Sequence, residues 1–178
     1  MTKIDPASLS ARWRVVRADP VRFEELFELY RSSREYFDYF SLDATKERLY
    51  RDMTMLPDGC SSEQKHFLAY YDNGVLTAIL DLIEGFPSAR ICYIGLFMVS
   101  AGLAGCGVGT AVITELCAAL SRLGFEAVRL AYGKQYAQAA HFWTKNGFVP
   151  LREAVDDEYG RLIVAQKDLR CQPDSAAC

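Results

Sequence analysis

Clusters of basic residues, paired metal ligands and long apolar runs are all scarce in this sequence. Its 178 residues contain 20 Lys and Arg against 23 Asp and Glu, a net charge of −3, and no basic cluster stands out. We therefore expect no nucleic-acid partner. No apolar run is long enough to span a bilayer, so we expect no membrane partner. Residues 1–10 lack the apolar core of a secretory signal, which predicts a cytoplasmic protein.

Metal-ligand spacing is also lacking. None of the six cysteines forms a C-x-x-C pair, and the only two histidines, His66 and His141, lie far apart in the chain and near no cysteine. Zinc sites in proteins need such ligands close together. We therefore predict no metal, and free thiols in a reducing compartment.

The composition is that of an ordinary folded protein. Hydrophobic residues make up 51% and charged residues 24% of the chain, which excludes a disordered protein. The length fits a single domain over residues 1–178, with residues 170–178 as a loose tail.

Strands and helices alternate along the chain. Apolar runs predict strands over residues 12–18, 66–71, 75–84, 90–99, 127–132, 148–155 and 161–168. Apolar spacing of three and four predicts helices after the caps Asp19 and Asp43, and over residues 107–123 and 137–145. This order predicts an α/β fold, a mixed sheet of about seven strands with helices on both faces.

A glycine-rich loop, Gly102 to Thr110, lies between an apolar strand and the best predicted helix. Glycines let a backbone approach a ligand closely, and free N–H groups at a helix start suit phosphate. The other interpretation is a tight turn that needs glycine only for steric reasons. A Walker loop is excluded because Val108 and Gly109 follow Gly107 in place of Lys and Ser or Thr. A dinucleotide-binding loop would need glycine at Val112.

The stretch from Leu96 to Phe148 resembles the core of the Gcn5-related N-acetyltransferase (GNAT) superfamily. Residues 104–109, Ala-Gly-Cys-Gly-Val-Gly, match the family's [Q/R]-x-x-G-x-[G/A] loop, and residues 142–148, Phe-Trp-Thr-Lys-Asn-Gly-Phe, are similar to its F-Y-x-K-x-G-F segment. Two motifs in this order are more specific than either alone, and the order of elements also matches. The chain resembles bacterial members of the family.

This resemblance implies a twisted sheet that splays between its fourth and fifth strands and binds acetyl-CoA in the gap. It implies an N-acetyltransferase that moves an acetyl group directly to a primary amine of a small molecule or peptide. Many members are dimers, so a homodimer is open. The residues that it places at acetyl-CoA are Phe97, Met98, Val99, Ala104, Gly105, Cys106, Gly107, Val108, Gly109, Thr110, Phe142 and Lys145.

Three departures from the family pattern leave the chemistry open, one of them Tyr136 where the family often has an Asn that contacts the cofactor. Ala104 replaces the usual Gln or Arg, and Trp143 replaces a Tyr that often protonates the leaving thiolate. An indole is no useful acid, so the acid is Tyr132, Tyr136 or water. These departures keep open a second interpretation, a catalytically silent module that binds acetyl-CoA as a sensor or partner.

The general base and the pocket for the amine substrate are the parts of the site that the sequence determines least. Asp81 and Glu84 are the candidate bases, although either could be a structural carboxylate. The aromatic segment Tyr36 to Phe40 would form a wall for the acceptor, or fill the core under the first helices. We predict an acceptor site lined by Tyr36, Tyr39 and Tyr93.

Overall fold

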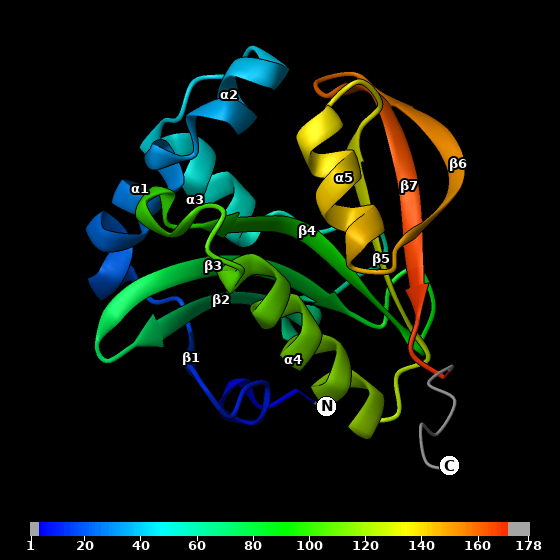
Figure 1. The fold of residues 1–178 in the computed structure, drawn as a ribbon, viewed down its shortest axis with the longest axis horizontal. Coiled ribbons are helices and arrows are strands. Elements are labelled where there is room, and N and C mark those ends of the chain that lie inside the picture. Colours follow the sequence, from blue (N-terminus) through cyan, green and yellow to red (C-terminus); the bar gives the residue numbers. More distant parts are fainter. Residues whose placement is uncertain (1–3, 171–178) are drawn as a thin grey trace.

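The computed structural model describes residues 4–170 (Figure 1). All but residue 170 of the predicted tail lies outside the described residues. The strands are β1 (Arg14–Arg17), β2 (Lys65–Asp72), β3 (Val75–Glu84), β4 (Ile91–Val99), β5 (Ala127–Gly133), β6 (Val149–Asp156) and β7 (Gly160–Asp168). The α-helices are α1 (Phe23–Ser32), α2 (Arg34–Phe40), α3 (Lys46–Thr54), α4 (Val108–Arg122) and α5 (Ala137–Lys145).

The seven strands form one sheet in the order β1-β2-β3-β4-β5-β7-β6. Every neighbouring pair is antiparallel except β4 and β5, which are parallel because α4 carries the chain back across the sheet. The predicted α/β fold with a mixed sheet of about seven strands is confirmed.

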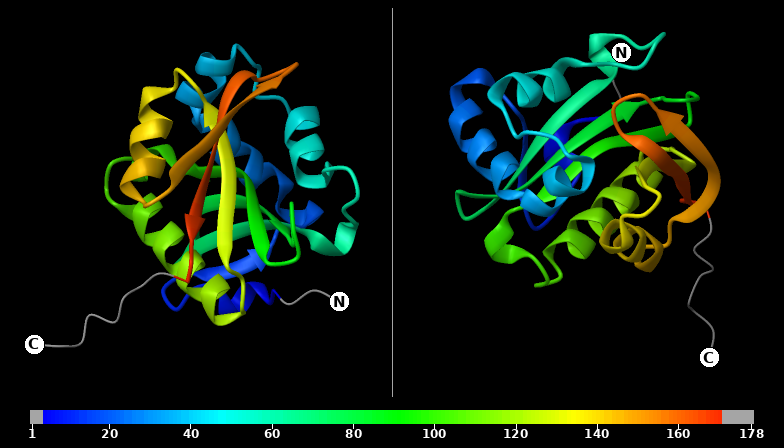
Figure 2. Two further views of the ribbon diagram at one scale, coloured as in Figure 1. Left: turned by 90° about the vertical axis from the view of Figure 1, so that its right-hand side faces the viewer. Right: turned by 90° about the horizontal axis from the view of Figure 1, so that it is seen from above.

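Helices cover both faces of the sheet (Figure 2). Leu116 and Leu120 of α4 and Trp143 of α5 pack in one apolar cluster with alternate residues of β2 to β5. Leu26 of α1 and Leu49 of α3 pack on the opposite face with the intervening strand residues. We call these the α4 face and the α1 face. Because strand side chains alternate between faces, each strand residue can be assigned to one of the two.

Most boundaries of the helices and strands follow from local signals in the sequence. Asp19 accepts a hydrogen bond from Val21 N and begins the short 3-10 helix η2 (Pro20–Arg22) ahead of α1. Gly124, with φ +87°, ends α4, and Phe125 N donates to Leu120 O beyond it. The predicted cap Asp43 is wrong: Thr45 caps α3, its Oγ1 accepting from Arg48 N at 3.1 Å.

Three further 3-10 turns complete the described chain: η1 (Pro6–Ser8), η3 (Ser62–Gln64) and η4 (Ala101–Leu103). Helix α2 was not predicted as a helix, because its seven residues are too few to show a helical period and four of them are aromatic. Within residues 4–170, no helix is both long and apolar enough to cross a membrane.

Candidate active site

The sheet opens between β4 and β5. These strands pair only from Ile91 with Ala127 to Ile94 with Leu130. Beyond that point β4 keeps its pairing with β3 as far as Val99, and β5 keeps its pairing with β7 as far as Gly133. The two strands therefore present unpaired edges to each other across a gap. Gly95 is exposed although it lies in the middle of a seven-stranded sheet.

A β-bulge marks the start of this opening. Asp81 pairs with Leu96 while Leu82 pairs with Ile94, so Gly95 is an extra residue in β4. A Cβ atom on Gly95 would overlap Asp81 Oδ2 and lie 3.2 Å from its Cγ. The glycine is therefore required by the neighbouring carboxylate, which occupies the space of the missing side chain.

Asp81 is almost completely buried, with 7% of its surface exposed. Its Oδ2 accepts a hydrogen bond from Lys65 Nζ at 2.9 Å, and Oδ1 has no hydrogen-bond partner among the described residues. Lys65 Nζ also donates to Met55 O at 2.7 Å. Burial raises the pKa of Asp81 from 3.8 to about 6, and the Lys65 ammonium holds it from rising further. At neutral pH this group is a carboxylate with one free acceptor oxygen.

Glu84 does not join Asp81. It lies on the α4 face, where its Oε2 is 3.1 Å from Nε2 of the buried His66. Asp81 lies on the α1 face, since the two residues are three positions apart on a strand whose side chains alternate between faces. The two candidate bases therefore lie on opposite faces of the sheet. Tyr93 does lie on the Asp81 side, where burial raises the pKa of its phenol and the charge of Asp81 adds to the increase.

The glycine loop offers free backbone donors. Helix α4 begins after Gly107 with no side-chain cap, and no backbone hydrogen bond from the N–H groups of residues 107–110 is present in the described chain. Gly105 and Gly107 have φ +76° and +79°, and no atom lies within 4 Å of a Cβ placed on either. The N–H of Cys106 donates to Leu103 O at 3.2 Å, so this predicted phosphate donor is already used within the loop.

Aromatic side chains line the gap on the α4 face. The rings of Phe97 and Phe142 stack with centroids 6.0 Å apart. Phe142 also packs so closely on Gly109 that a Cβ there would lie 3.1 Å from the ring, and 3.5 Å from Val99. These predicted cofactor residues are therefore brought together. The side chain of Met98 is instead buried on the α1 face, which leaves only its backbone near the gap.

Helix α5 closes the same face. Trp143 is 8% exposed and packs against Phe148, with ring centroids 5.1 Å apart, and against Phe142 at 4.9 Å. Asn146 Nδ2 lies 3.4 Å from Thr110 Oγ1, so the end of α5 lies against the first turn of α4. Lys145, the preceding residue, is exposed at this junction. Trp143 is a packing residue of α5, while its chemical role stays a prediction.

The two tyrosine candidates for the acid lie on different sides. Tyr132 packs in the cluster of the α4 face, near the end of β5, and burial raises the pKa of its phenol. Tyr136 instead stacks on Tyr39 of α2, with centroids 4.6 Å apart, and its hydroxyl contacts Gln138 Oε1 at 3.3 Å. Tyr132 therefore shares a face with the glycine loop, and Tyr136 shares one with α2.

Helix α2 reaches across the gap from the α1 face. The ring of Tyr39 lies on Gly133, where a Cβ would be 2.6 Å from its Cζ, and its hydroxyl accepts from Gln135 N at 3.1 Å. Tyr36 packs on Phe40, with centroids 5.0 Å apart. The predicted aromatic segment is thus brought to the open end of β5.

Sequence reasoning missed a buried polar network beneath these helices. Asp52 of α3 accepts from the Tyr30 hydroxyl at 2.6 Å, and its charge contributes to the raised pKa of Asp81. Burial raises the pKa of Asp52 itself. Lys65 completes the network. No motif marks these residues; the one available signal was a lysine at the start of an otherwise apolar strand.

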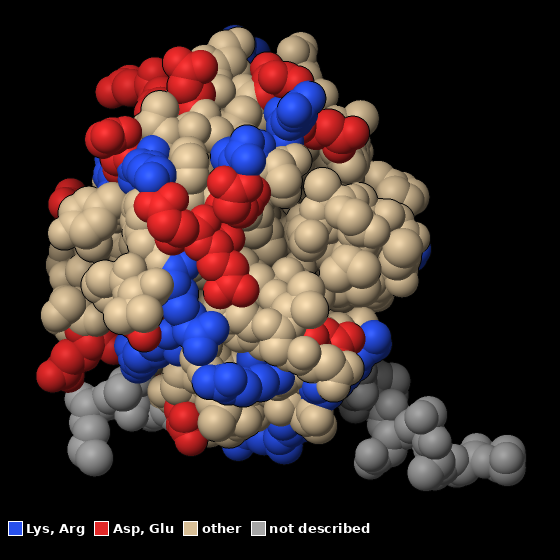
Figure 3. All heavy atoms as spheres, turned by 90° about the vertical axis from the view of Figure 1, so that its left-hand side faces the viewer, with Lys and Arg blue, Asp and Glu red and all other residues tan. Residues whose placement is uncertain are grey.

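The outer surface of this side mixes both signs of charge. Acidic side chains gather near its centre, with Lys and Arg beside them (Figure 3). Among the exposed ion pairs of the first helices, Lys46 Nζ lies 2.6 Å from Glu24 Oε1. Within residues 4–170 no group of three or more His, Cys, Asp or Glu could hold a metal ion.

Comparison with known proteins decides the family. The model of the acetyltransferase (GNAT) family matches residues 23–148. The chain belongs to the GNAT family of acetyltransferases. It is an N-acetyltransferase enzyme, as the motifs of residues 104–109 and 142–148 indicated.

Solved structures share this GNAT fold. An acetyltransferase from Thermus thermophilus has a TM-score of 0.71 at 18% identity, covering 88% of this chain and 96% of that one. The PaiA N-acetyltransferase from Thermoplasma acidophilum, in complex with coenzyme A, has a TM-score of 0.62 at 17% identity, covering 88% and 98%. A GCN5-related N-acetyltransferase from Kribbella flavida has 0.61 at 21%, also covering 88% and 98%. No curated protein matches the sequence.

Proposed function

We propose that this GNAT enzyme transfers the acetyl group of acetyl-CoA directly to a primary amine of a small molecule or peptide. The observation that carries the proposal is the opening between β4 and β5, which has free backbone donors at one end and a buried carboxylate beside it. The backbone N–H donors lie on the α4 face and the carboxylate lies on the α1 face. The acetyl donor and the amine acceptor can therefore approach the gap from opposite sides.

The residues of the α4 face fit acetyl-CoA. The N–H groups of residues 107–110 point out of a helix start that has no cap, which suits pyrophosphate oxygens. Open space at Gly105 and Gly107 leaves room for phosphate next to the backbone. Phe97 and Phe142 would contact the pantetheine chain, whose amides would meet the unpaired edge of β4. When bound, acetyl-CoA supplies an acetyl group activated as a thioester.

Asp81 is the proposed base. An alkylammonium must lose a proton before its nitrogen can attack a carbonyl carbon. Asp81 Oδ1 is free to accept that proton, and a pKa of about 6 keeps the group ionised at neutral pH while making it more basic than an exposed aspartate. Lys65 fixes the orientation of the carboxylate through Oδ2. Glu84 is not part of this proposal.

Tyr132 is the proposed acid. It lies on the same face as the glycine loop, and its raised pKa keeps the phenol protonated at neutral pH. A phenol O–H placed there can donate to a departing thiolate sulfur. Tyr136, on the α2 side, is assigned to the wall of the acceptor pocket instead. Water remains a substitute for the acid because a thiolate is a tolerable leaving group.

The direct test measures release of the CoA thiol from acetyl-CoA with a panel of primary amines, with mass spectrometry of the acetylated product. We expect amine-dependent release that saturates with acetyl-CoA. Binding of acetyl-CoA without release, across polyamines, amino acids and peptides, would instead support the silent acetyl-CoA-binding module. Failure to bind acetyl-CoA would contradict both.

A further inference from the structure

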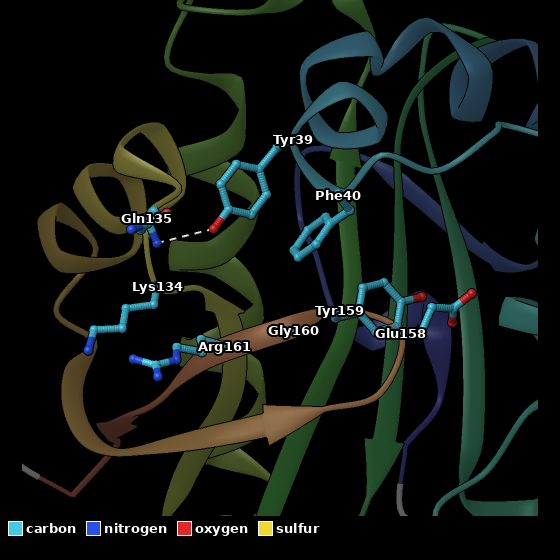
Figure 4. A pocket seen from close by; sticks show the side chains of 8 residues that line it. All are labelled: Tyr39, Phe40, Lys134, Gln135, Glu158, Tyr159, Gly160 and Arg161. Atoms are coloured by element: carbon cyan, nitrogen blue, oxygen red, sulfur yellow. Dashed lines mark hydrogen bonds between the residues drawn. The ribbon is translucent and has the colours of Figure 1, made fainter.

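A hollow of about 550 Å³ lies at the open end of β5. It is formed by α2, the turn between β5 and α5, and the turn between β6 and β7 (Figure 4). The side chain of Tyr39, anchored on Gly133, forms its inner edge. The residues that line it are Tyr39, Phe40, Lys134, Gln135, Glu158, Tyr159, Gly160 and Arg161.

One side of this hollow is aromatic. Phe40 and Tyr159 pack edge to face, with centroids 5.2 Å apart, and Tyr39 packs on Phe40 at 4.7 Å. Tyr159 also interacts with the hydroxyl of Tyr36, which in turn lies within the field of Asp52. Aromatic walls of this kind bind apolar or flat ligand groups.

The other side is cationic. Lys134 and Arg161 lie together opposite Phe40 and Tyr159 (Figure 4). Lys134 Nζ pairs with Glu153 Oε1 at 2.6 Å, whereas Arg161 forms no ion pair with any side chain of residues 4–170. The hydrogen bond from Lys134 lowers the pKa of Glu153 and the charge of Arg161 contributes to this, but a guanidinium that forms no ion pair can bind an anionic group on a ligand.

Glu158, which lines the hollow, is already paired with cations. The carboxylate of Glu158 is held by two arginines of α3, Arg48 at 2.9 Å and Arg51 at 2.7 Å. Lys134 is likewise paired with Glu153, which leaves Arg161 as the lining cation without an ion pair among residues 4–170. An anionic group on a ligand would be attracted to that guanidinium.

We propose that the acceptor is an amine that also carries an anionic group, a carboxylate or phosphate, on an apolar or aromatic body. Arg161, supported by Lys134, binds the anion, Phe40 and Tyr159 hold the body, and the amine points toward Asp81. The acetylation of this acceptor rests on the proposed function, whereas its binding in the hollow does not. The proposal favours amino acids, terminal peptide residues and aminophosphates as acceptors over polyamines.

The test compares matched amines that differ only in the anionic group. The pairs are phenylalanine with 2-phenylethylamine, tryptophan with tryptamine, and phosphoethanolamine with ethanolamine. Binding is measured by calorimetry with CoA present, and turnover by thiol release. We expect the anionic member of at least one pair to bind about tenfold or more tightly than its partner. Arg161→Gln should remove that preference, while the exposed Arg14→Gln on β1 should keep it.

Two outcomes would overturn the proposal. One is binding without preference for the anionic group, shown by no difference within all three pairs or by tighter binding of spermidine. The other is an Arg161→Gln variant that loses acetyl-CoA affinity and leaves amine binding unchanged, since the hollow would then serve the CoA phosphates. Binding of an anionic amine without thiol release would contradict the proposed reaction and leave this proposal standing. Thiol release without the preference would do the reverse.

Discussion

The Asp81 carboxylate occupies the space that a side chain at Gly95 would fill. This relationship links the shape of the sheet to its chemistry. The bulge at Gly95 begins the opening between β4 and β5, and the same residue leaves room for a buried carboxylate beside that opening. A requirement for glycine in the middle of an apolar strand therefore has a specific cause here.

The first prediction concerns that contact. Gly95→Ala should push the Asp81 carboxylate away from Lys65 and lower the free energy of unfolding by about 1–3 kcal/mol. The turnover number should fall with it, measured as amine-dependent thiol release. Gly102→Ala is the control, because no atom lies within 4 Å of a Cβ at Gly102. Equal behaviour of the two variants would mean that Asp81 tolerates displacement.

The second prediction is a pH dependence set by Asp81. Because its pKa is about 6, kcat should fall as the pH drops below about 6 and the base becomes protonated. Asp81→Asn should lose this acidic limb and reduce kcat by roughly 100-fold to 10,000-fold. An unchanged pH profile in a folded Asp81→Asn variant would assign the base to another group.

Asp81 should also make the stability of the fold depend on pH, and here a rise in pH is unfavourable, whereas it favours kcat. Folding raises the pKa of Asp81 from 3.8 to about 6. The folded state therefore holds a proton that the unfolded chain has lost, and this stabilisation disappears as the pH rises through that window. Asp81→Asn should be free of this decline. Chemical denaturation of both proteins at several pH values measures it without any substrate.

The third prediction concerns Lys65, which lowers the pKa of Asp81. Lys65→Met should raise that pKa, so the acidic limb of kcat should move above pH 6 and activity should recover at more alkaline pH. Breaking this buried pair should also cost about 3–5 kcal/mol of stability. A limb that stays in place while stability falls would show that Lys65 supports the fold and does not tune the base.

The fourth prediction concerns Tyr39, which α2 places on Gly133. Tyr39→Ala should remove the inner edge of the acceptor hollow and raise the acceptor KM by roughly threefold to tenfold. Acetyl-CoA affinity should not change, since the glycine loop lies on the opposite face. Tyr50→Ala, at a residue 64% exposed on α3, is the matched control. A change in acetyl-CoA affinity with Tyr39→Ala would mean that α2 contacts the cofactor side.

Much of the fold could be predicted from the sequence because its signals are local. Apolar runs placed the predicted strands within two residues of their observed bounds, and the glycine at position 124 ended α4 as expected. The glycine loop and the segment around Phe142 were recognisable as motifs, and the structure places them on one face. Short α2 escaped prediction, and the cap at Thr45 was assigned to Asp43 because both residues are good caps.

The acceptor side could be predicted much less well, because it is formed by residues that are far apart in the sequence. The three-position spacing of Asp81 and Glu84 on one strand already puts them on opposite faces, but which helices cover each face follows only from the packing. Lys65, Asp52 and Arg161 come from three separate elements and form no motif. The role of their charges can be inferred only from the folded structure, in which α2, α3 and the β6–β7 turn come together at the open end of β5.

Binding of acetyl-CoA to the glycine loop is the central claim, and isothermal titration calorimetry tests it most directly. The wild-type protein should bind acetyl-CoA with a stoichiometry near one per chain. In Gly107→Val, a side chain at φ +79° both strains the loop and fills the space beside the free N–H groups. Its affinity should fall by about tenfold or more, while Gly102→Ala should bind as the wild type does. Undiminished affinity in a folded Gly107→Val variant, or no binding by the wild type, would contradict the account.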